Sequence, residues 1–259
     1  MTQPTVPNSP ADVPNSPADV PKSPADGPKS PGSITFEHLL ERARALAGTG
    51  QRRILGIVGA PGAGKSHLTH RLLEALGPDL AAAAPMDGFH LAGTVLTSLG
   101  RTQRKGAPDT FDGEGYVALL RRLRDQACPP NPARRPMHDP THDPARDGVI
   151  FAPEYRRDLK ESVGSAIPIH AQVPLVITEG NYLLLDRHPW DRVVGLLDET
   201  WYLAPPQDLR LRRLTARHQA YGKSAEAAAQ WALGPDEHNA ELIGATAHRA
   251  SAVWRLNEA

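Results

Sequence analysis

One stretch of the chain has the spacing of a phosphate-binding loop, G-x-x-x-x-G-K-[ST], because it reads Gly59-Ala60-Pro61-Gly62-Ala63-Gly64-Lys65-Ser66. Glycines let backbone N–H groups turn toward phosphate oxygens, and the helix that follows such a loop adds the positive end of its dipole. In this pattern Lys65 reaches the β- and γ-phosphates and the Ser66 hydroxyl holds Mg²⁺. A dinucleotide-binding turn would need G-x-G-x-x-G, which the residues after Gly64 do not provide. The predicted nucleotide-binding residues are Gly59, Ala60, Pro61, Gly62, Ala63, Gly64, Lys65, Ser66 and His67.

Two carboxylates, Asp87 and Glu179, stand at the ends of predicted strands. Ligands of open α/β sheets sit beyond the carboxyl ends of the strands. Beside a bound triphosphate, an acid at that place can hold Mg²⁺ or accept a proton from an attacking hydroxyl. Either residue alone could instead be a solvated turn acid, but the neighbouring phosphate loop favours a role in the site.

Three arginines, Arg210, Arg213 and Arg217, fall on one stripe of a predicted helix because their spacing is i, i+3 and i+7. They could form an exposed basic face. They could equally belong to a lid that neutralises charge on a transferred phosphoryl group. The spacing alone does not decide between the two.

The elements that must position these residues alternate between strands and helices. Strands are predicted at 54–58, 80–87, 173–178 and 199–203, with short edge strands at 149–151 and 167–169. The alanines at 81–84 favour a helix by propensity, but the unit opened by the phosphate loop needs a second parallel strand. Helices are predicted at 34–47 with Ser33 as its cap, 65–76, 90–99, 115–126, 190–197, 206–219, 224–233 and 236–254. This order predicts a three-layer α/β/α P-loop NTPase fold with a mainly parallel sheet and a helical lid near 206–223.

Two segments differ in composition from the rest. Residues 1–32 repeat a seven-residue proline-rich unit and hold nine of the 26 prolines, which predicts a disordered tail. Residues 128–147 are rich in proline and repeat His-Asp-Pro, and we interpret them as a loop insertion in preference to a metal site. The predicted P-loop domain is therefore 33–259.

Composition narrows the class of protein. The 259 residues carry 29 basic and 29 acidic side chains, so no net charge points to nucleic acid or to a membrane surface. The single cysteine, Cys128, suits a reducing compartment. No apolar run approaches the roughly 18 residues of a membrane span, and no signal peptide is evident. We expect a soluble cytoplasmic protein, and a homodimer stays open.

Four motifs resemble the uridine kinase/phosphoribulokinase superfamily, and most closely its bacterial nucleoside/nucleotide kinase-like branch related to pantothenate kinase. They are Met86-Asp87-Gly88-Phe89-His90, Arg104-Lys105-Gly106-Ala107-Pro108-Asp109-Thr110-Phe111-Asp112, Glu179-Gly180-Asn181-Tyr182-Leu183-Leu184-Leu185 and Asn239-Ala240-Glu241-Leu242-Ile243. The resemblance runs from about residue 35 to the C-terminus. The phosphate loop is shared by many families, whereas these motifs in this order are much more specific.

The resemblance implies a role for each matching position. Asp87 would be the base on the acceptor hydroxyl, Glu179 would assist Mg²⁺, and Arg213 and Arg217 would act with Lys65 in catalysis. The implied acceptor pocket comprises Phe89, His90, Arg104, Lys105, Tyr155, Arg157 and Tyr182. Relatives often read Pro-x-Tyr/Phe-Asp-Arg where this chain has Arg156 in place of the acid, which leaves the acceptor open.

These observations predict an ATP- and Mg²⁺-dependent kinase that transfers the γ-phosphoryl group to a hydroxyl of a nucleoside-, pantothenate- or sugar-like acceptor. One alternative is a P-loop switch or metallochaperone GTPase, but the Asn-Lys-x-Asp motif that specifies guanine is missing from the sequence. A second alternative is a relative that binds ATP without catalysis, against which the intact Lys65, Ser66, Asp87 and Glu179 argue.

Overall fold

The computed structural model describes residues 31–126 and 148–256. Nearly all of the predicted tail and the whole predicted insertion at 128–147 therefore lie outside the described residues. None of the described helices combines the length and the apolar composition that crossing a bilayer requires.

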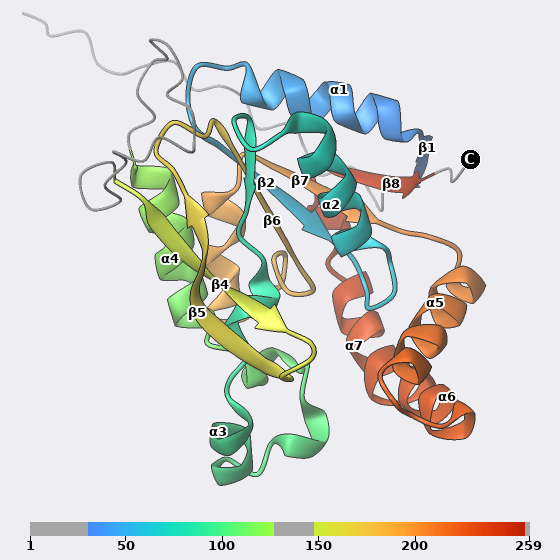
Figure 1. Cartoon of the computed structure of the whole chain (residues 1–259). Coiled ribbons are helices and arrows are strands. Elements are labelled where there is room, and N and C mark those ends of the chain that lie inside the picture. The colour runs from blue at the N-terminus through green and yellow to red at the C-terminus, as the bar shows by residue number, and fades with distance from the viewer. Residues whose placement is uncertain (1–30, 127–147, 257–259) are drawn as a thin grey trace, which may run out of the picture.

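A six-stranded sheet forms the centre of the fold, and all of its paired strands run parallel (Figure 1). Its strands, in spatial order, are β1 (Gly32–Ile34), β8 (Ala252–Leu256), β7 (Glu199–Leu203), β2 (Arg53–Val58), β6 (Leu175–Gly180) and β3 (Ala81–Ala83). The strand before the phosphate loop, β2, lies between β6 and β7, with Val58 paired to Gly180 and Tyr202. The carboxyl ends of β2, β6 and β3 therefore meet at one edge, where Glu179 is the penultimate residue of β6 and Asp87 lies in the turn after β3.

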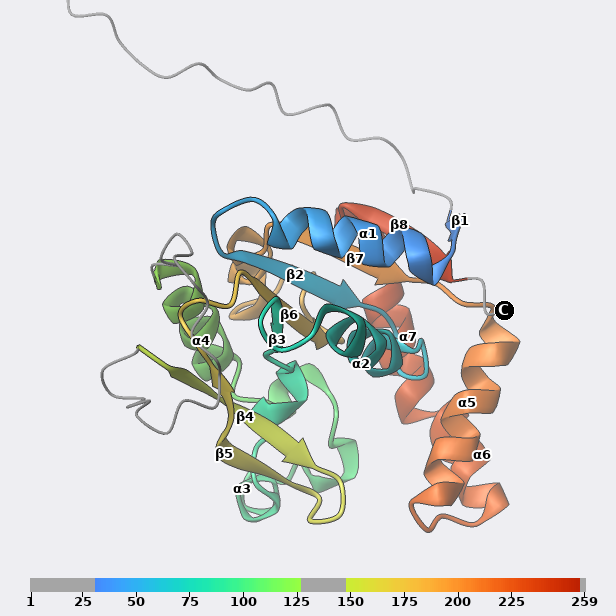
Figure 2. The same ribbon diagram turned by 45° about the horizontal axis from the view of Figure 1, so that its top comes forward.

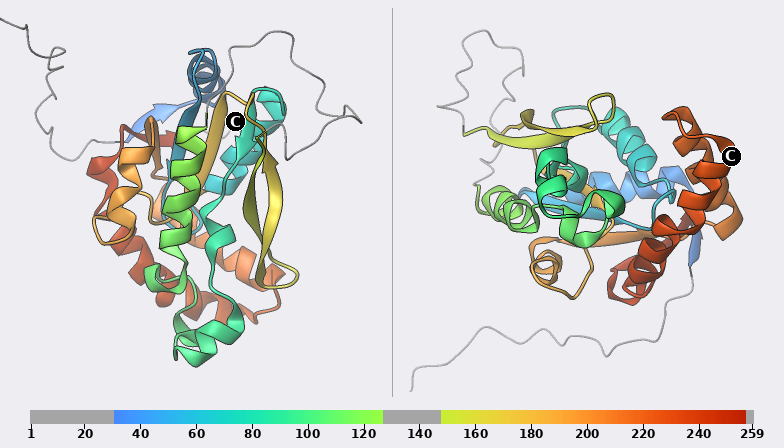
Figure 3. Two further views of the ribbon diagram at one scale, coloured as in Figure 1. Left: turned by 90° about the vertical axis from the view of Figure 1, so that its left-hand side faces the viewer. Right: turned by 90° about the horizontal axis from the view of Figure 1, so that it is seen from below.

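Helices cover both faces of this sheet, which confirms the predicted three-layer α/β/α fold (Figures 2 and 3). On one face, α1 (Phe36–Ala47) and α2 (Lys65–Leu76) bury Leu39, Leu68 and Leu72 against β2. On the other, α4 (Gly113–Asp125) and α7 (Pro235–Gly244) pack around Trp190. Because both faces are covered, β2 and β6 are buried almost throughout, and burial of that apolar surface stabilises the sheet.

Two further helices, α5 (Gln207–Ala220) and α6 (Ala225–Leu233), form an arm beside the carboxyl edge of the sheet (Figure 2). Ser224 caps α6 by accepting a hydrogen bond from the backbone N–H of Ala227. The segment predicted as a helical lid is part of this arm.

An antiparallel hairpin lies on the opposite side of that edge and is separate from the main sheet (Figure 1). It consists of β4 (Ile150–Arg156) and β5 (Glu161–Ile169). The strands predicted at 149–151 and 167–169 are present, but they are longer and do not form edges of the main sheet. Because one face of the hairpin is exposed, its polar residues conceal the full length of the strands in the sequence. The hairpin packs on the turn after β3 so closely that a Cβ on Gly88 would lie 2.3 Å from the carbonyl oxygen of Pro153.

Four other local predictions differ from the structure. Thr35, and not Ser33, caps α1, because its side chain accepts from the backbone N–H of His38. The last predicted helix ends at Gly244, since the following residues turn into strand β8. The segment 190–197 forms two 3₁₀ turns, and the predicted helix at 90–99 is reduced to α3 (Gly93–Ser98). The decision to override the helix propensity was correct, because Ala81–Ala83 form β3, although this strand is shorter than the predicted 80–87.

Candidate active site

The phosphate loop connects β2 to the start of α2, as its sequence predicts. Two of its glycines are required by the geometry. Gly62 has a φ of 82°, and a Cβ there would lie 2.6 Å from the carbonyl oxygen of Arg210. Gly64 has a φ of 94° and begins α2 in a left-handed conformation that a side chain would strain.

Lys65 is buried beneath this loop. Its Nζ donates hydrogen bonds to the carbonyl oxygen of Gly59 at 2.8 Å, to that of Ala60 at 3.3 Å and to Asn181 Oδ1 at 2.8 Å. Burial lowers the pKa of the Lys65 ammonium, while the carboxylates of Glu179 and Asp87 oppose the shift. The three acceptors fix the lysine at the carboxyl ends of β2 and β6.

Ser66 and Glu179 meet next to it, because the Ser66 hydroxyl donates to Glu179 Oε1 at 2.9 Å. Burial raises the pKa of the Glu179 carboxyl, the charge of Asp87 adds to the shift, and Lys65 and Ser66 oppose it. Hydroxyl and carboxylate oxygens are the donors that Mg²⁺ prefers. In the described ranges no group of three or more His, Cys, Asp or Glu side chains is arranged to hold a metal ion. A Mg²⁺ ion held here would thus need phosphate or water oxygens as further ligands.

Asp87 lies in the 3₁₀ turn that follows β3, with its side chain about one-third exposed. Arg157, at the end of the hairpin, approaches its carboxylate with 3.8 Å between Nη2 and Oδ2. The backbone carbonyl of Asp87 is 2.8 Å from His90 Nδ1. Burial lowers the pKa of the His90 imidazole, which favours its neutral form.

The three arginines of the predicted stripe separate into two groups. Arg210 is buried, donates to the carbonyl oxygen of Pro61 at 3.3 Å and pairs with Glu237, so it supports the phosphate loop from below. Arg213 and Arg217 line the cavity beside the loop. Burial lowers the pKa of the Arg217 guanidinium, and the neighbouring charge of Arg157 acts in the same direction. The stripe is therefore not an exposed basic face.

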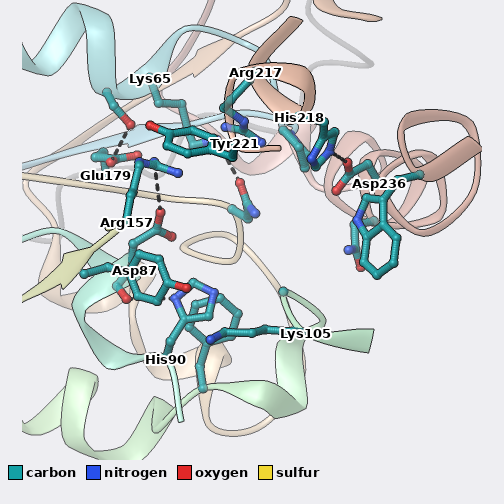
Figure 4. Close-up of a pocket in the computed structure, with 18 residues that line it drawn as sticks. Lys65, Asp87, His90, Lys105, Arg157, Glu179, Arg217, His218, Tyr221 and Asp236 are labelled. Atoms are coloured by element: carbon teal, nitrogen blue, oxygen red, sulfur yellow. Dashed lines mark hydrogen bonds and ion pairs between the residues drawn. The ribbon is translucent and has the colours of Figure 1, made fainter. Parts of the chain in front are cut away.

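Two connected cavities contain most of the predicted site residues. One, of about 230 Å³, is lined by Gly62, Gly64, Lys65, Ser66, His67, Arg157, Arg213 and Arg217. The other, of about 240 Å³, is lined by ten predicted residues, namely Pro61, Lys65, Ser66, Asp87, His90, Lys105, Tyr155, Arg157, Glu179 and Arg217 (Figure 4). Lys65, Ser66, Arg157 and Arg217 line both cavities, so these residues join the phosphate loop to the surroundings of Asp87.

Three residues of the predicted acceptor pocket lie outside these cavities. Phe89 packs edge-on against Tyr116 in the core, with 5.3 Å between ring centroids. Tyr182 is buried and donates from its hydroxyl to the carbonyl oxygen of Gly106 at 2.5 Å. Arg104 forms an exposed pair with Asp109. Phe89 and Tyr182 therefore pack behind the residues that line the cavity.

Several cavity residues were not predicted from the sequence: Gly106, Phe111, Asn181, His218, Tyr221, Trp231, Asp236 and Asn239. His218 on α5 and Asp236 on α7 lie 2.7 Å apart and tie the arm together. These two residues are too far apart along the chain to form a local sequence motif. In contrast, Gly106, Phe111, Asn181 and Asn239 belong to the motifs quoted above, so the signal that places them was in the sequence.

A third cavity, of about 330 Å³, adjoins the opposite side of the phosphate loop and is mainly apolar. It is lined by Ala63, Gly64, His67, Leu203, Pro205, Leu209, Arg213, Trp254 and Leu256. Arg213 belongs both to this cavity and to the one beside the loop.

Comparisons with known proteins agree with this fold. No family model matches the chain. It is 31% identical over 148 residues to the "ATP-dependent kinase-like protein notR'" of Aspergillus versicolor, which covers 56% of this chain and 77% of the relative. A "Putative uridine kinase C227.14" of Schizosaccharomyces pombe is 28% identical over 199 residues, 74% of this chain and 77% of the relative.

A solved structure is similar over its whole length. It is described as a "putative fructose transport system kinase from Silicibacter sp. TM1040", and it aligns with a TM-score of 0.70 and 30% identity over 86% of this chain and 100% of its own. The chain therefore belongs to the uridine kinase-like superfamily of P-loop kinases.

Proposed function

We propose that this protein is an ATP- and Mg²⁺-dependent kinase that transfers the γ-phosphoryl group to a hydroxyl of a small-molecule acceptor. One observation carries the proposal: Asp87, which follows β3, lines the same cavity as Lys65 and Ser66 of the phosphate loop. A phosphoryl transfer needs a proton acceptor and a phosphate site within one enclosed space, because positioning and charge neutralisation supply most of the rate.

The nucleotide has a continuous path through the three cavities. The apolar cavity beside Trp254 suits the base, since base sites are mostly apolar with few polar groups. The phosphates would follow the cavity of Gly62 and Arg213 toward Lys65. Arg217 and Arg157 line the end of this path, where they would neutralise charge that develops on the transferred group.

Ser66 and Glu179 would hold Mg²⁺ together with phosphate oxygens. The ion would supply charge neutralisation on the phosphates when bound. The burial that raises the pKa of Glu179 supports this assignment, because a buried carboxylate gains most from a cation close to it. The Ser66 hydroxyl, which points at Glu179 in this structure, would turn one of its lone pairs to the ion.

Asp87 would accept the proton of the acceptor hydroxyl. Its carboxylate is partly exposed to the cavity and has Arg157 as its cationic neighbour, so the charge is held at this place without being covered. The neutral imidazole of His90 bonds the Asp87 backbone and not its carboxylate, which leaves the carboxylate oxygens accessible to an acceptor.

A screen of acceptor-dependent ADP formation tests the proposal. We expect ADP release that requires Mg²⁺ and rises with one class of hydroxylated acceptor, with phosphate recovered on that acceptor. Slow ATP hydrolysis at a rate independent of every acceptor would contradict a kinase and would favour a nucleotide-dependent switch. ATP affinity, measured by calorimetry on the same protein, separates a failed acceptor site from a failed nucleotide site.

A further inference from the structure

The part of the Asp87 cavity that lies away from the phosphate loop, where the acceptor would bind, contains one lysine without a carboxylate partner among the described residues. Lys105 lines this cavity together with Asp87, and within the described ranges no acid lies within ion-pair distance of its Nζ. Each carboxylate of the cavity has a different partner: Glu179 bonds Ser66, Asp87 faces Arg157, and Asp236 bonds His218. The cavity therefore presents an uncompensated ammonium group.

Lys105 is held in place by its surroundings. Its Nζ donates to the carbonyl oxygen of Lys160 at 2.8 Å and lies 5.2 Å from the centre of the Tyr155 ring. Its loop is tied as well, because the Gly106 N–H donates to Thr110 Oγ1 at 2.9 Å and its carbonyl accepts from Tyr182. An ammonium group has three N–H donors, and the Lys160 carbonyl uses one. The remaining donors are available to a ligand in the cavity.

The position of Lys105 relative to Asp87 sets the geometry of that ligand. In Figure 4 Lys105 and His90 lie on one side of Asp87, and Lys65 lies on the other. A molecule whose hydroxyl reaches Asp87 from the Lys105 side would therefore bring its opposite end toward Lys105. The wall between them is made of rings, with His90 centred 4.0 Å from Phe111 and 4.6 Å from Tyr155.

The size of the cavity limits the acceptor further. Its volume of about 240 Å³ must also contain the end of the triphosphate chain, since Lys65 and Ser66 line it. Sites for drug-sized ligands usually measure about 300–1,000 Å³. A compact molecule fits within this cavity, whereas a nucleoside would have to extend its base into the neighbouring cavity of about 990 Å³, which shares Phe111 and Asn239 with it.

We propose that the acceptor is a compact hydroxy acid, with its reacting hydroxyl at Asp87 and a carboxylate or phosphate group at Lys105. The inference rests on the proposed kinase function. Charge complementarity carries it, because an anionic group would accept charge-assisted hydrogen bonds from the remaining Lys105 donors that are stronger than those a neutral sugar accepts.

Matched acceptor pairs test this assignment, with ADP formation measured at saturating Mg²⁺-ATP. The carboxylate pairs are glycerate with glycerol and pantothenate with panthenol, and the phosphate pairs are ribose 5-phosphate with ribose and glycerol 3-phosphate with glycerol. We expect the anionic member of at least one pair to exceed its neutral partner by about 10–100-fold in kcat/KM, the range that a charge-assisted hydrogen bond gives. A preference seen only in the carboxylate pairs would place a carboxylate at Lys105, and a preference seen only in the phosphate pairs would place a phosphate there.

Variants of two neighbouring lysines supply the control. Lys105→Met should raise KM for the anionic acceptor about 10–100-fold and abolish the preference over its neutral partner, with KM for ATP unchanged. Lys105→Arg should keep the preference. Lys160→Met removes an equal charge nearby but leaves the Lys160 carbonyl that Lys105 bonds, so it should behave as wild type.

Two outcomes would overturn the assignment in distinguishable ways. Neutral partners that react as fast as the acids, or a Lys105→Met variant with an unchanged preference, would refute the anionic acceptor and leave the kinase function standing. Absence of turnover with every acceptor by a protein that still binds ATP would refute both.

Discussion

Lys65 Nζ donates a 2.8 Å hydrogen bond to Asn181 Oδ1, which joins the phosphate loop to the segment that follows β6. Asn181 comes two residues after Glu179, so a single strand end supplies both the carboxylate near Ser66 and the amide that holds the lysine. The lysine is buried and its donors are occupied by protein oxygens. A bound triphosphate would have to replace some of these acceptors with phosphate oxygens.

Replacement of this lysine gives the first prediction. Lys65→Met should lower kcat by at least about 100-fold, because it removes a preorganised cation from the transferred phosphoryl group. The measurement is Mg²⁺-dependent ADP formation. The thermal midpoint without nucleotide should fall only modestly, because removal of a buried cation offsets part of the loss of its three hydrogen bonds. Near-normal turnover would refute the site assignment.

The second prediction concerns the proposed base. Asp87→Asn keeps the shape of the side chain but removes the carboxylate that would take the proton from the acceptor hydroxyl. We expect kcat to fall by about 10²–10⁴-fold while the calorimetric Kd for ATP changes little. Asp186→Asn, at an exposed position outside the cavities, is the matched control and should react as wild type. If Asp87→Asn were equally active, the base would lie elsewhere.

The fold was largely predictable because its signals are local. The phosphate loop, the buried apolar strands β2 and β6 and the amphipathic helix α4 each carry their pattern within about a dozen residues. The strands that were missed, or were predicted too short, depend on distant partners. Strand β8 is held by β7 and β1, and one face of the β4–β5 hairpin is exposed, so neither shows a clean apolar pattern.

Site residues could be predicted from the sequence only where a motif places a residue at the end of a strand. Glu179 is the penultimate residue of β6, and Asp87 lies in the 3₁₀ turn after β3, so the parallel pairing of β3 with β6 and of β6 with β2 brings both acids to the phosphate loop. Helical spacing placed Arg210, Arg213 and Arg217 on one stripe but could not show that Arg210 faces the loop backbone. His218 and Asp236 meet only because α5 and α7 converge, a tertiary contact that no spacing reveals.

The third prediction concerns where the folded domain begins. Gly32 pairs with Trp254, and a Cβ on Gly32 would lie 3.0 Å from the Trp254 ring. Deletion of residues 1–30 should leave the thermal midpoint nearly unchanged, because their proline-rich composition cannot bury a core. Deletion of residues 1–34 removes β1 and should lower the midpoint by roughly 2–4 °C for each kcal/mol of lost stability. Equal midpoints for the two truncated proteins would show that β1 contributes nothing to the fold.

The fourth prediction follows from the buried carboxyl of Glu179, whose pKa lies above 4.5, its ordinary value. The folded protein therefore binds this proton more tightly than the unfolded chain does. As the pH rises from 4.5 through the raised pKa, the unfolded chain releases its proton first, and the free energy of unfolding falls. Above the folded-state pKa, Glu179 is ionised in the folded protein as well, and the free energy of unfolding is then lowered by the full cost of burying this charge.

Glu179→Gln cannot ionise and escapes this cost. Without nucleotide and Mg²⁺, we expect the variant to unfold at a higher temperature than the wild type near neutral pH, by roughly 2–4 °C per kcal/mol relieved, with a smaller difference near pH 4.5. Mg²⁺-ATP should reverse the order, because it stabilises only the protein that retains the carboxylate ligand, and Mg²⁺-dependent turnover should be lost. Unfolding curves at both pH values, with and without Mg²⁺-ATP, measure all of these effects. A variant less stable than the wild type at neutral pH would mean that the ionised Glu179 contributes more through Ser66 and Lys65 than its burial costs.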